Sequence, residues 1–247
     1  IPAPYWLSYP EMVRLAGAEP VVVPTTEETA WKITAEQFEN AMTPKTKMII
    51  LNTPGNPTGS VYTRDELRAI AEVAAEEEIY ILSDEIYEKL VYDGTEHVSI
   101  ASLSPEAYDL TITVNGFSKA YSMTGWRLGY LAAPEPIAKA IDSMQSHSTS
   151  NPCSFSQKGA IAAIKGDQQC VIDMREEFNI RREYMHSRLS AITGITAVKP
   201  LGAFYVLANI SQLGLNSTNF ADRLLSKANV AVVPGIAFGD DRTIRFS

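Results

Sequence analysis

Cysteine and histidine are scarce in this sequence, whose 247 residues include two cysteines and three histidines. Cys153 and Cys170 form no CxxC pair and are too few for a disulfide framework, which favours a reducing compartment. His97, His147 and His186 do not have the spacing of a known metal-binding motif. The sequence therefore predicts neither a structural disulfide nor a metal site.

Long apolar runs and an excess of positive charge are also missing. No segment reaches the about 20 consecutive apolar residues that a membrane-spanning helix needs. The 21 basic residues are outnumbered by 29 acidic ones, and the net charge of −8 argues against nucleic acid or an anionic membrane as a partner. A small anionic ligand is still possible, because a few placed arginines can bind one. The GxSxG elbow of many hydrolases and the GxxxxGK[ST] phosphate loop are absent as well.

The start of the sequence does not have the pattern of a signal peptide. The opening Ile-Pro-Ala-Pro-Tyr-Trp lacks a basic region and an apolar region, and it has no initiator methionine. The last residues, Thr243-Ile-Arg-Phe-Ser247, resemble a strand that is cut short. We therefore expect a chain that is truncated at both ends. A cytoplasmic location is expected, with a plastid or another organelle as the alternative if a transit peptide has been lost.

Apolar runs alternate with helical patterns along the first half of the chain, which is typical of an α/β protein. Because these runs are continuously apolar, we expect a sheet that is covered on both faces. The expected strands are 21–24, 47–52, 79–82, 110–114 and 128–132. Between two of them, Thr63 and Glu66 form a capping box, which opens a helix with Leu67 and Ile70 on its apolar face.

The chain after Pro134 is mainly helical, and a long charged segment at 167–192 is expected to be one amphipathic helix. Short apolar runs then surround one further helical pattern, which predicts a small α+β region. Its expected elements are a strand at 203–207, a helix at 220–228 and a strand at 230–233. We therefore expect a large domain over residues 1–170 and a small domain over residues 171–247.

Polar residues follow two of the predicted strands, at the place where ligands bind in open α/β sheets. Asn56 lies in Asn52-Thr-Pro-Gly-Asn56-Pro57-Thr-Gly59, which taken alone is an ordinary turn. Asp84, in Asp84-Glu-Ile-Tyr87, could bind a cation, a ribose or a ring nitrogen, or it could cap a helix. Arg245 has the planar fork that matches a carboxylate, although an edge or salt-bridged arginine is an alternative.

A third group contains a lysine in an unusual setting. Lys119 and Arg127 lie in Gly116-Phe-Ser-Lys119-Ala-Tyr-Ser-Met-Thr-Gly-Trp-Arg127-Leu-Gly129, among small, hydroxylic and apolar residues. A poorly solvated lysine has a lowered pKa, which frees its amine for nucleophilic attack. Most lysines are instead ordinary surface residues. The small neighbours argue against that alternative, because a solvated loop does not need them.

In combination, these motifs resemble the class I/II aminotransferases, which are fold-type I pyridoxal-phosphate enzymes, and in particular their aspartate and aspartate/prephenate branch. The resemblance covers essentially the whole chain. Its key residues, in chain order, are Asn56, Asp84, Tyr87, Lys119, Arg127 and Arg245. It implies an α/β fold with a three-layer, mostly parallel sheet and a smaller C-terminal α+β domain. It also implies pyridoxal 5′-phosphate as cofactor and assembly as a homodimer.

The resemblance further implies catalytic and cofactor-binding roles. Lys119 would hold the cofactor as a Schiff base and then act as the general base that moves the α-proton. Asp84 would pair with the pyridine nitrogen and keep it protonated, so that the ring withdraws electrons. Tyr87 and Asn56 would hydrogen-bond the phenolic oxygen of the ring. Trp6 would stack on the ring, although a core or interface tryptophan is the alternative.

The remaining implied residues bind phosphate or substrate. Arg127 would bind the cofactor phosphate with Ser118 as a neighbour, while Gly116 stands where many relatives have a serine. Arg245 would bind the α-carboxylate of the substrate, with Trp6 and Asn56 beside it. Asn151 stands where the family approaches the active site of the partner subunit.

The implied reaction is amino transfer from an acidic amino acid, aspartate or glutamate, to a 2-oxo acid such as 2-oxoglutarate, oxaloacetate or prephenate. The lysine motif does not separate this reaction from a β-lyase, a decarboxylase or a synthase on the same fold. A non-catalytic fragment is a third alternative, because the family's N-terminal segment, with its phosphate loop and its groups that read the substrate side chain, is not in this sequence.

Overall fold

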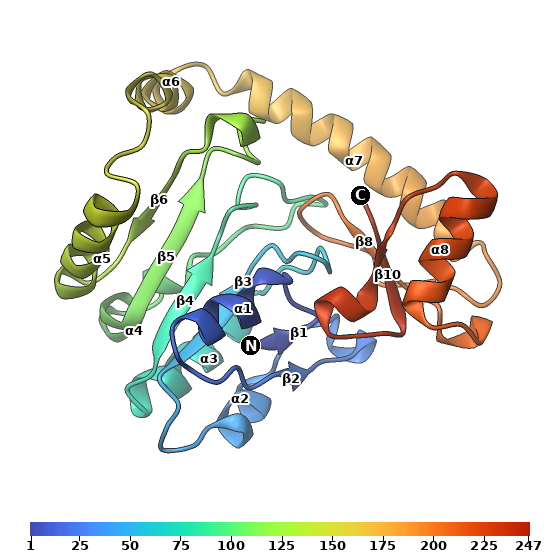
Figure 1. Ribbon diagram of the computed structural model, residues 1–247, viewed down its shortest axis with the longest axis horizontal. Helices are drawn as coiled ribbons and strands as arrows, with labels where there is room; N and C mark the ends of the chain where they lie inside the picture. The colour runs from blue at the N-terminus through green and yellow to red at the C-terminus, as the bar shows by residue number, and fades with distance from the viewer.

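The computed structural model describes residues 1–247, and its centre is a four-stranded sheet with the order β3-β4-β5-β6 (Figure 1). Three strands run parallel and the last runs antiparallel to its neighbour. The strands are β3 Met48–Asn52, β4 Tyr80–Asp84, β5 Thr111–Gly116 and β6 Gly129–Ala132. The predicted mostly parallel sheet is therefore confirmed, with boundaries that differ from the prediction by one or two residues.

The register of the sheet explains where a site can form. Asn52 is paired with Asp84, and Asp84 is paired with Val114, so the carboxyl ends of β3, β4 and β5 meet along one edge. The loops that follow these strands carry the polar motifs of the sequence. Residues that are far apart in the chain are thereby brought to one edge of the sheet.

One face of β3, β4 and β5 is covered by helices α2 Ala35–Ala41, α3 Arg64–Glu76 and α4 Pro105–Leu110. Thr63 and Glu66 make the predicted capping box at the start of α3. Leu67 and Ile70 are fully buried against the sheet, as the sequence predicts. The helix forms because a capped start, an apolar stripe and good helix formers coincide.

The edge of the sheet formed by β6 is exposed to solvent. All residues of β6 are exposed, and none of α5 Glu135–Ser148 is buried. The following α6 Ser154–Lys165 buries only Ser156 and Ala160. The expectation that every strand is covered on both faces is therefore wrong for β6. The apolar residues of β6 predict a buried strand, but β6 runs antiparallel to β5 at the edge of the sheet, where its side chains are exposed.

The long helix α7 Gln169–Ser190 connects α6 with the small sheet (Figure 1). The prediction of a long helix is confirmed. Its buried and half-buried residues recur every three or four positions along one side, where apolar residues such as Val171 and Leu189 alternate with the buried Arg182. Arg182 donates hydrogen bonds to the carbonyl oxygen of Pro200 at 2.7 Å and to Asp93 at 2.6 Å. A buried, paired arginine therefore attaches the middle of this helix.

The small sheet has the order β7-β8-β10-β9 and is entirely antiparallel. Its elements are β7 Thr196–Ala197, β8 Val206–Asn209, α8 Ser217–Ala228, β9 Val233–Pro234 and β10 Thr243–Phe246. The expected α+β character is confirmed, but the strands predicted at 203–207 and 230–233 both begin later than expected, as β8 and β9. Ala203 has a φ of 57°, a left-handed conformation that a strand residue does not adopt, so β8 begins only at Val206.

The N-terminal segment lies between the two sheets. Its elements are β1 Pro2–Ala3, α1 Ser8–Leu15 and β2 Val23–Pro24, and β1 pairs in parallel with β2. The backbone N–H of Tyr5 donates to the carbonyl oxygen of Phe238 at 3.1 Å, which links this segment to the small sheet. The domain bounds at residue 170 stay a prediction.

Short turns complete the chain. Five 3-10 helices stand at Glu27–Thr29, Ile100–Ser102, Thr124–Trp126, Ser211–Leu213 and Gly235–Phe238. None of the helices is both long enough and apolar enough to cross a membrane.

Candidate active site

The polar edge of the central sheet joins residues from both sheets. Asp84 is the last residue of β4, Asn56 follows β3, and Lys119 follows β5. Arg245 comes from β10 of the small sheet, yet its Nη1 donates to Oδ1 of Asn56 at 3.0 Å. This hydrogen bond spans 189 positions of the chain. The fold thus assembles the predicted residues from distant parts of the sequence.

Lys119 stands in the turn that joins β5 to β6. A Cβ atom on Gly116 would lie 3.1 Å from the Cα of Gly129, so a glycine permits the close approach of these strands. Nζ of Lys119 lies 5.9 Å from the ring centroid of Tyr87 and 5.6 Å from that of Phe204, and it has no ion-pair partner. The amine is therefore held among aromatic rings and is free for a ligand.

The electrostatic setting of Lys119 agrees with the sequence prediction. Burial lowers its pKa, and the positive charges of Arg245 and Arg127 lower it further, while Asp84 raises it. A lowered pKa increases the fraction of neutral, nucleophilic amine. The same interactions indicate that these charged groups converge on Lys119.

Asp84 has hydrogen-bond donors but no cation. Its Oδ2 accepts from the hydroxyl of Tyr9 at 2.5 Å, and its Oδ1 accepts from the backbone N–H of Ile86 at 3.2 Å. Burial raises the pKa of Asp84, although these two hydrogen bonds lower it in part. A positively charged partner at this carboxylate would oppose the cost of burial. Such a site suits a protonated ring nitrogen.

Tyr9 is a site residue that sequence reasoning missed. It belongs to α1 and is separated from Asp84 by 75 positions, so no local spacing predicted the contact. Burial and the neighbouring carboxylate raise the pKa of Tyr9, which keeps its hydroxyl a donor. The ring of Trp6 packs edge-on against that of Tyr9, with centroids 5.3 Å apart. Trp6 is thus near the site, and its stacking on a cofactor stays a prediction.

A second missed residue is Tyr205, just before β8. Its hydroxyl lies 2.6 Å from that of Tyr87, and either hydroxyl can be the donor. The guanidinium of Arg245 lies 4.6 Å from the ring centroid of Tyr205 and 5.0 Å from that of Phe238. Burial lowers the pKa of Arg245, and its Nε is buried without a hydrogen-bond partner. An incoming carboxylate would give that nitrogen an acceptor.

Arg127 and its surroundings are open to solvent. Arg127 is exposed with a φ of 53°, and its Nη1 donates to the carbonyl oxygen of Thr124 at 2.9 Å. Ser118 is half-buried, and its carbonyl oxygen accepts from the hydroxyl of Thr124 at 3.0 Å. A hollow of about 450 Å³ lies against Arg127, between it and the start of α6. The hollow leaves room for an anion near this arginine.

Asn151 is not brought to the other predicted residues. It is exposed between α5 and α6 and makes no hydrogen bond to any of them. Its predicted role belongs to a partner subunit, so a single chain does not test it.

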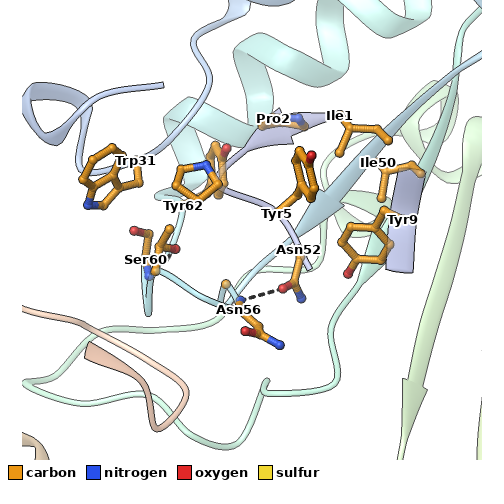
Figure 2. Close-up of a pocket in the computed structure, with 13 residues that line it drawn as sticks. Ile1, Pro2, Tyr5, Tyr9, Trp31, Ile50, Asn52, Asn56, Ser60 and Tyr62 are labelled. Atoms are coloured by element: carbon orange, nitrogen blue, oxygen red, sulfur yellow. Dashed lines mark hydrogen bonds between the residues drawn. The ribbon is translucent and has the colours of Figure 1, made fainter. Parts of the chain in front are cut away.

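A small cavity lies beside the site and is lined by the N-terminal segment and residues 50–62 (Figure 2). Its volume of about 30 Å³ corresponds to roughly one water molecule, which is too small for a cofactor. Asn52 lies at its edge, and its Oδ1 accepts from the backbone N–H of Asn56 at 2.7 Å (Figure 2). This hydrogen bond fixes the loop that presents the Asn56 side chain to Arg245.

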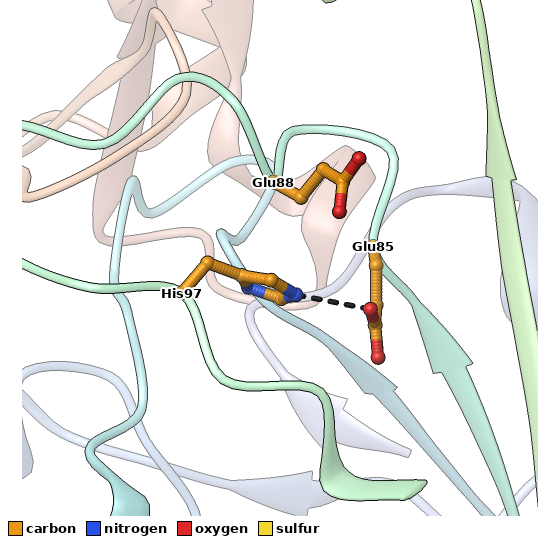
Figure 3. A group of neighbouring side chains, drawn as sticks. All are labelled: Glu85, Glu88 and His97. Carbon is orange, nitrogen blue, oxygen red and sulfur yellow. Dashed lines mark hydrogen bonds and ion pairs between the residues drawn. The ribbon is translucent and has the colours of Figure 1, made fainter. Parts of the chain in front are cut away.

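Behind Asp84 lies a cluster of Glu85, Glu88 and His97, whose possible ligand atoms are all within 4.8 Å of one another (Figure 3). Sequence spacing gave no sign of it. The Glu85 carboxylate is 3.0 Å from Nε2 of His97 and accepts hydrogen bonds from Ser83 at 3.0 Å and Ser99 at 2.7 Å. Because Glu85 is buried and has three side-chain partners, the cluster anchors the residue next to Asp84.

Comparisons with known proteins agree on one family. The model of the family "Aminotransferase class I and II" matches residues 1–247. An aspartate aminotransferase of Bacillus sp. strain YM-2 is 54% identical over 252 residues, and an aspartate/prephenate aminotransferase of Cereibacter sphaeroides is 47% identical over 258 residues. The crystal structure of an aspartate aminotransferase from Rhizobium meliloti superposes with a TM-score of 0.96 at 38% identity.

For the two relatives and for the crystal structure, the match covers 100% of this chain and 64% of the other protein. The chain therefore spans somewhat less than two thirds of the length of these proteins.

Proposed function

Because this chain belongs to the class I and II aminotransferase family, we propose that it binds pyridoxal 5′-phosphate and serves amino transfer between an acidic amino acid and a 2-oxo acid. The family's fold agrees with the expected fold-type I architecture. Support for the function comes from one observation above all. Asp84, Arg127 and Arg245 each perturb the pKa of the unpaired Lys119 amine, although they come from different elements of the fold.

The residues fit the cofactor. When bound, pyridoxal phosphate supplies a pyridine ring that withdraws electrons from the substrate. Lys119 would be the nucleophile that holds the cofactor and the base that moves a proton. Asp84 would keep a proton on the ring nitrogen, because a buried carboxylate that is in no ion pair favours a positive partner. Tyr87 and Asn56 would hydrogen-bond the phenolic oxygen, as the family resemblance implies.

The remaining polar groups suit phosphate and carboxylate. Arg127 binds the phosphate, with Ser118 nearby, at the open hollow beside α6. Arg245 would bind the α-carboxylate of the substrate side-on through the unpartnered Nε and Nη2, a bidentate geometry that carboxylates favour, while its Nη1 donates to Asn56. The family resemblance adds Trp6 and Asn56 to the substrate-binding residues, and Asn56 accepts a hydrogen bond from Arg245.

The substrate class is inferred from the relatives, which are named as aspartate and aspartate/prephenate aminotransferases. We propose aspartate or glutamate as the donor, and 2-oxoglutarate, oxaloacetate or prephenate as the acceptor. The family resemblance also supports a homodimer in which Asn151 approaches the partner's site. Two free cysteines, Cys153 and Cys170, agree with a reducing, cytoplasmic environment.

The cofactor assignment is tested by visible absorbance after pyridoxal phosphate is added, followed by borohydride reduction and mass mapping. We expect the reduced adduct on Lys119. Lys119→Ala should form none, whereas the exposed Lys139→Ala should behave as the unchanged chain does. An adduct that persists in Lys119→Ala would refute the assignment.

The reaction is tested by incubating the loaded protein with aspartate and 2-oxoglutarate. Oxaloacetate and glutamate as products support amino transfer. Alanine and carbon dioxide from aspartate instead indicate a decarboxylase on the same site and contradict the proposed reaction.

A further inference from the structure

We propose that Tyr205 is a positioning residue that directs the hydroxyl proton of Tyr87 toward the cofactor, an inference that rests on the proposed function. Tyr205 is 6% exposed. It lies between Tyr87, which is proposed to contact the cofactor, and Arg245, which is proposed to bind the substrate carboxylate. Its hydroxyl lies 2.6 Å from that of Tyr87, and its ring lies under the guanidinium of Arg245. No sequence motif assigned it a role.

The number of protons decides the direction of the hydrogen bond. Each phenol has one proton, and the two oxygens are close enough for one hydrogen bond between them. If Tyr87 donates its proton to the phenolic oxygen of the cofactor, it has none left for Tyr205. The bond between the hydroxyls must then use the proton of Tyr205. Tyr205 is therefore the donor, and Tyr87 accepts from it while donating to the cofactor.

Two consecutive hydrogen bonds of this kind strengthen each other. A hydroxyl that accepts a hydrogen bond becomes a better donor, because the two bonds polarise each other. Tyr87 is 3% exposed, so no bulk water competes for its proton. Tyr205 thus makes Tyr87 a stronger donor and removes the alternative in which Tyr87 donates to Tyr205.

Arg245 reinforces this role of Tyr205. Its guanidinium lies 4.6 Å from the centroid of the Tyr205 ring, within the range of a cation–π contact. Burial raises the pKa of Tyr205, while the hydrogen bond with Tyr87 and then the charge of Arg245 lower it in part, so the hydroxyl keeps its proton beside the guanidinium. One aromatic ring thereby links the residue that binds the substrate carboxylate to the residue that contacts the cofactor.

The first test measures the pH dependence of the absorbance of the cofactor bound at Lys119. Tyr205→Phe removes the hydroxyl and keeps the ring under Arg245. The phenolic oxygen loses stabilisation, so the pKa of the Lys119–cofactor linkage should rise by about 0.5 to 1 unit, the size expected of one hydrogen bond. An unchanged pH profile overturns the proposal. Tyr108→Phe, at an exposed tyrosine of α4, is the matched control.

A second variant separates the hydroxyl from the ring. Tyr205→Leu removes both, so Arg245 loses its aromatic support and the affinity for succinate should fall. Tyr205→Phe should keep that affinity. Equal loss of succinate binding in both variants would mean that the hydroxyl acts on Arg245 and would contradict a role at Tyr87.

A third measurement needs no cofactor. The thermal unfolding of Tyr87→Phe, Tyr205→Phe and the double variant forms a double-mutant cycle. The two losses should not add, because either substitution breaks the same hydrogen bond. Additive losses overturn the proposal even if no cofactor is bound. A chain that forms no adduct at Lys119 contradicts the proposed function instead, and the cycle still decides whether the two hydroxyls are coupled.

Discussion

The two edges of the central sheet are built differently. The covered half consists of β3, β4 and helices α2, α3 and α4, and it contains the largest apolar core of the chain. The open half consists of β6, α5 and α6, where the strand is exposed and α5 buries nothing. Asp84 belongs to the covered half, whereas Arg127 lies beside the open one.

The two halves give the charged residues of the site different degrees of burial. Burial dominates the pKa of Asp84 and of Lys119, whereas the side chain of Arg127 is exposed to solvent. Interactions in a buried setting are stronger than those in water. The residues proposed to handle protons, Asp84 and Lys119, are therefore buried to a greater degree than Arg127, which is proposed to bind phosphate.

The largest contrast is expected between Asp84→Ala and Arg127→Ala. Asp84→Ala should slow conversion of the bound cofactor by aspartate at least about a hundredfold, the scale of an assisted proton transfer. Arg127→Ala should mainly weaken cofactor binding. Stopped-flow absorbance and cofactor titration separate the two effects, with the exposed Asp109→Ala as control. Near-normal conversion in Asp84→Ala would contradict the proposal that the buried Asp84 assists the reaction while Arg127 mainly binds the cofactor.

The next contrast concerns stability. Leu67→Ala in the covered half should lower the free energy of unfolding by about 2–5 kcal/mol, because it leaves a cavity in a packed core. Leu131→Ala in β6 should cost less than about 1 kcal/mol, since that side chain is exposed. Urea unfolding measures both. Similar losses would mean that β6 is buried in solution.

Arg245→Ala tests the contribution of the small sheet. It should raise the KM for aspartate roughly 10- to 100-fold, because hydrogen bonds to charged groups contribute about 1.5–3 kcal/mol. The affinity for pyridoxal phosphate should change much less. Arg245→Lys keeps the charge without the fork and should restore only part of the loss. Equal losses of substrate and cofactor affinity would indicate a structural role.

The smallest effect is a pH dependence. Since the folded state lowers the pKa of Lys119, the unfolded state binds more protons between that lowered pKa and the ordinary value of 10.5. The contribution of Lys119 to stability is therefore unfavourable at low pH and improves as pH rises through this window. Lys119→Met should flatten the rise in a set of thermal melts. An identical slope in the variant would show that Lys119 is well solvated.

Local signals in the sequence predicted local structure well. The capping box of Thr63 and Glu66 gave the start of α3, and the apolar runs gave β3 and β4 within two residues. Ala203 illustrates the limit, because its positive φ delays β8 and leaves no mark in composition. Arg182 is a second case, since nothing in the sequence marks this charged residue of a long helix as buried.

Sequence motifs predicted the main residues of the candidate site, but not the hydrogen bonds that some of them make with distant residues. Lys119, Asp84 and Arg245 do converge as expected, and their catalytic roles stay predictions. The partners Tyr9 and Tyr205 stand 75 and 118 positions from the residues they contact. Such contacts depend on how two sheets and the N-terminal segment pack, and periodicity in one sequence contains no information on that packing.

The hydrogen bond between Arg245 and Asn56 has a consequence for how the chain folds. A contact that joins residues 189 positions apart closes a very large loop, so it forms only after both sheets exist. The complete site is therefore a late event in folding. A ligand that needs both residues binds only the finished structure and stabilises it by mass action. The recovery of such binding during refolding would time the docking of the small sheet against the central one.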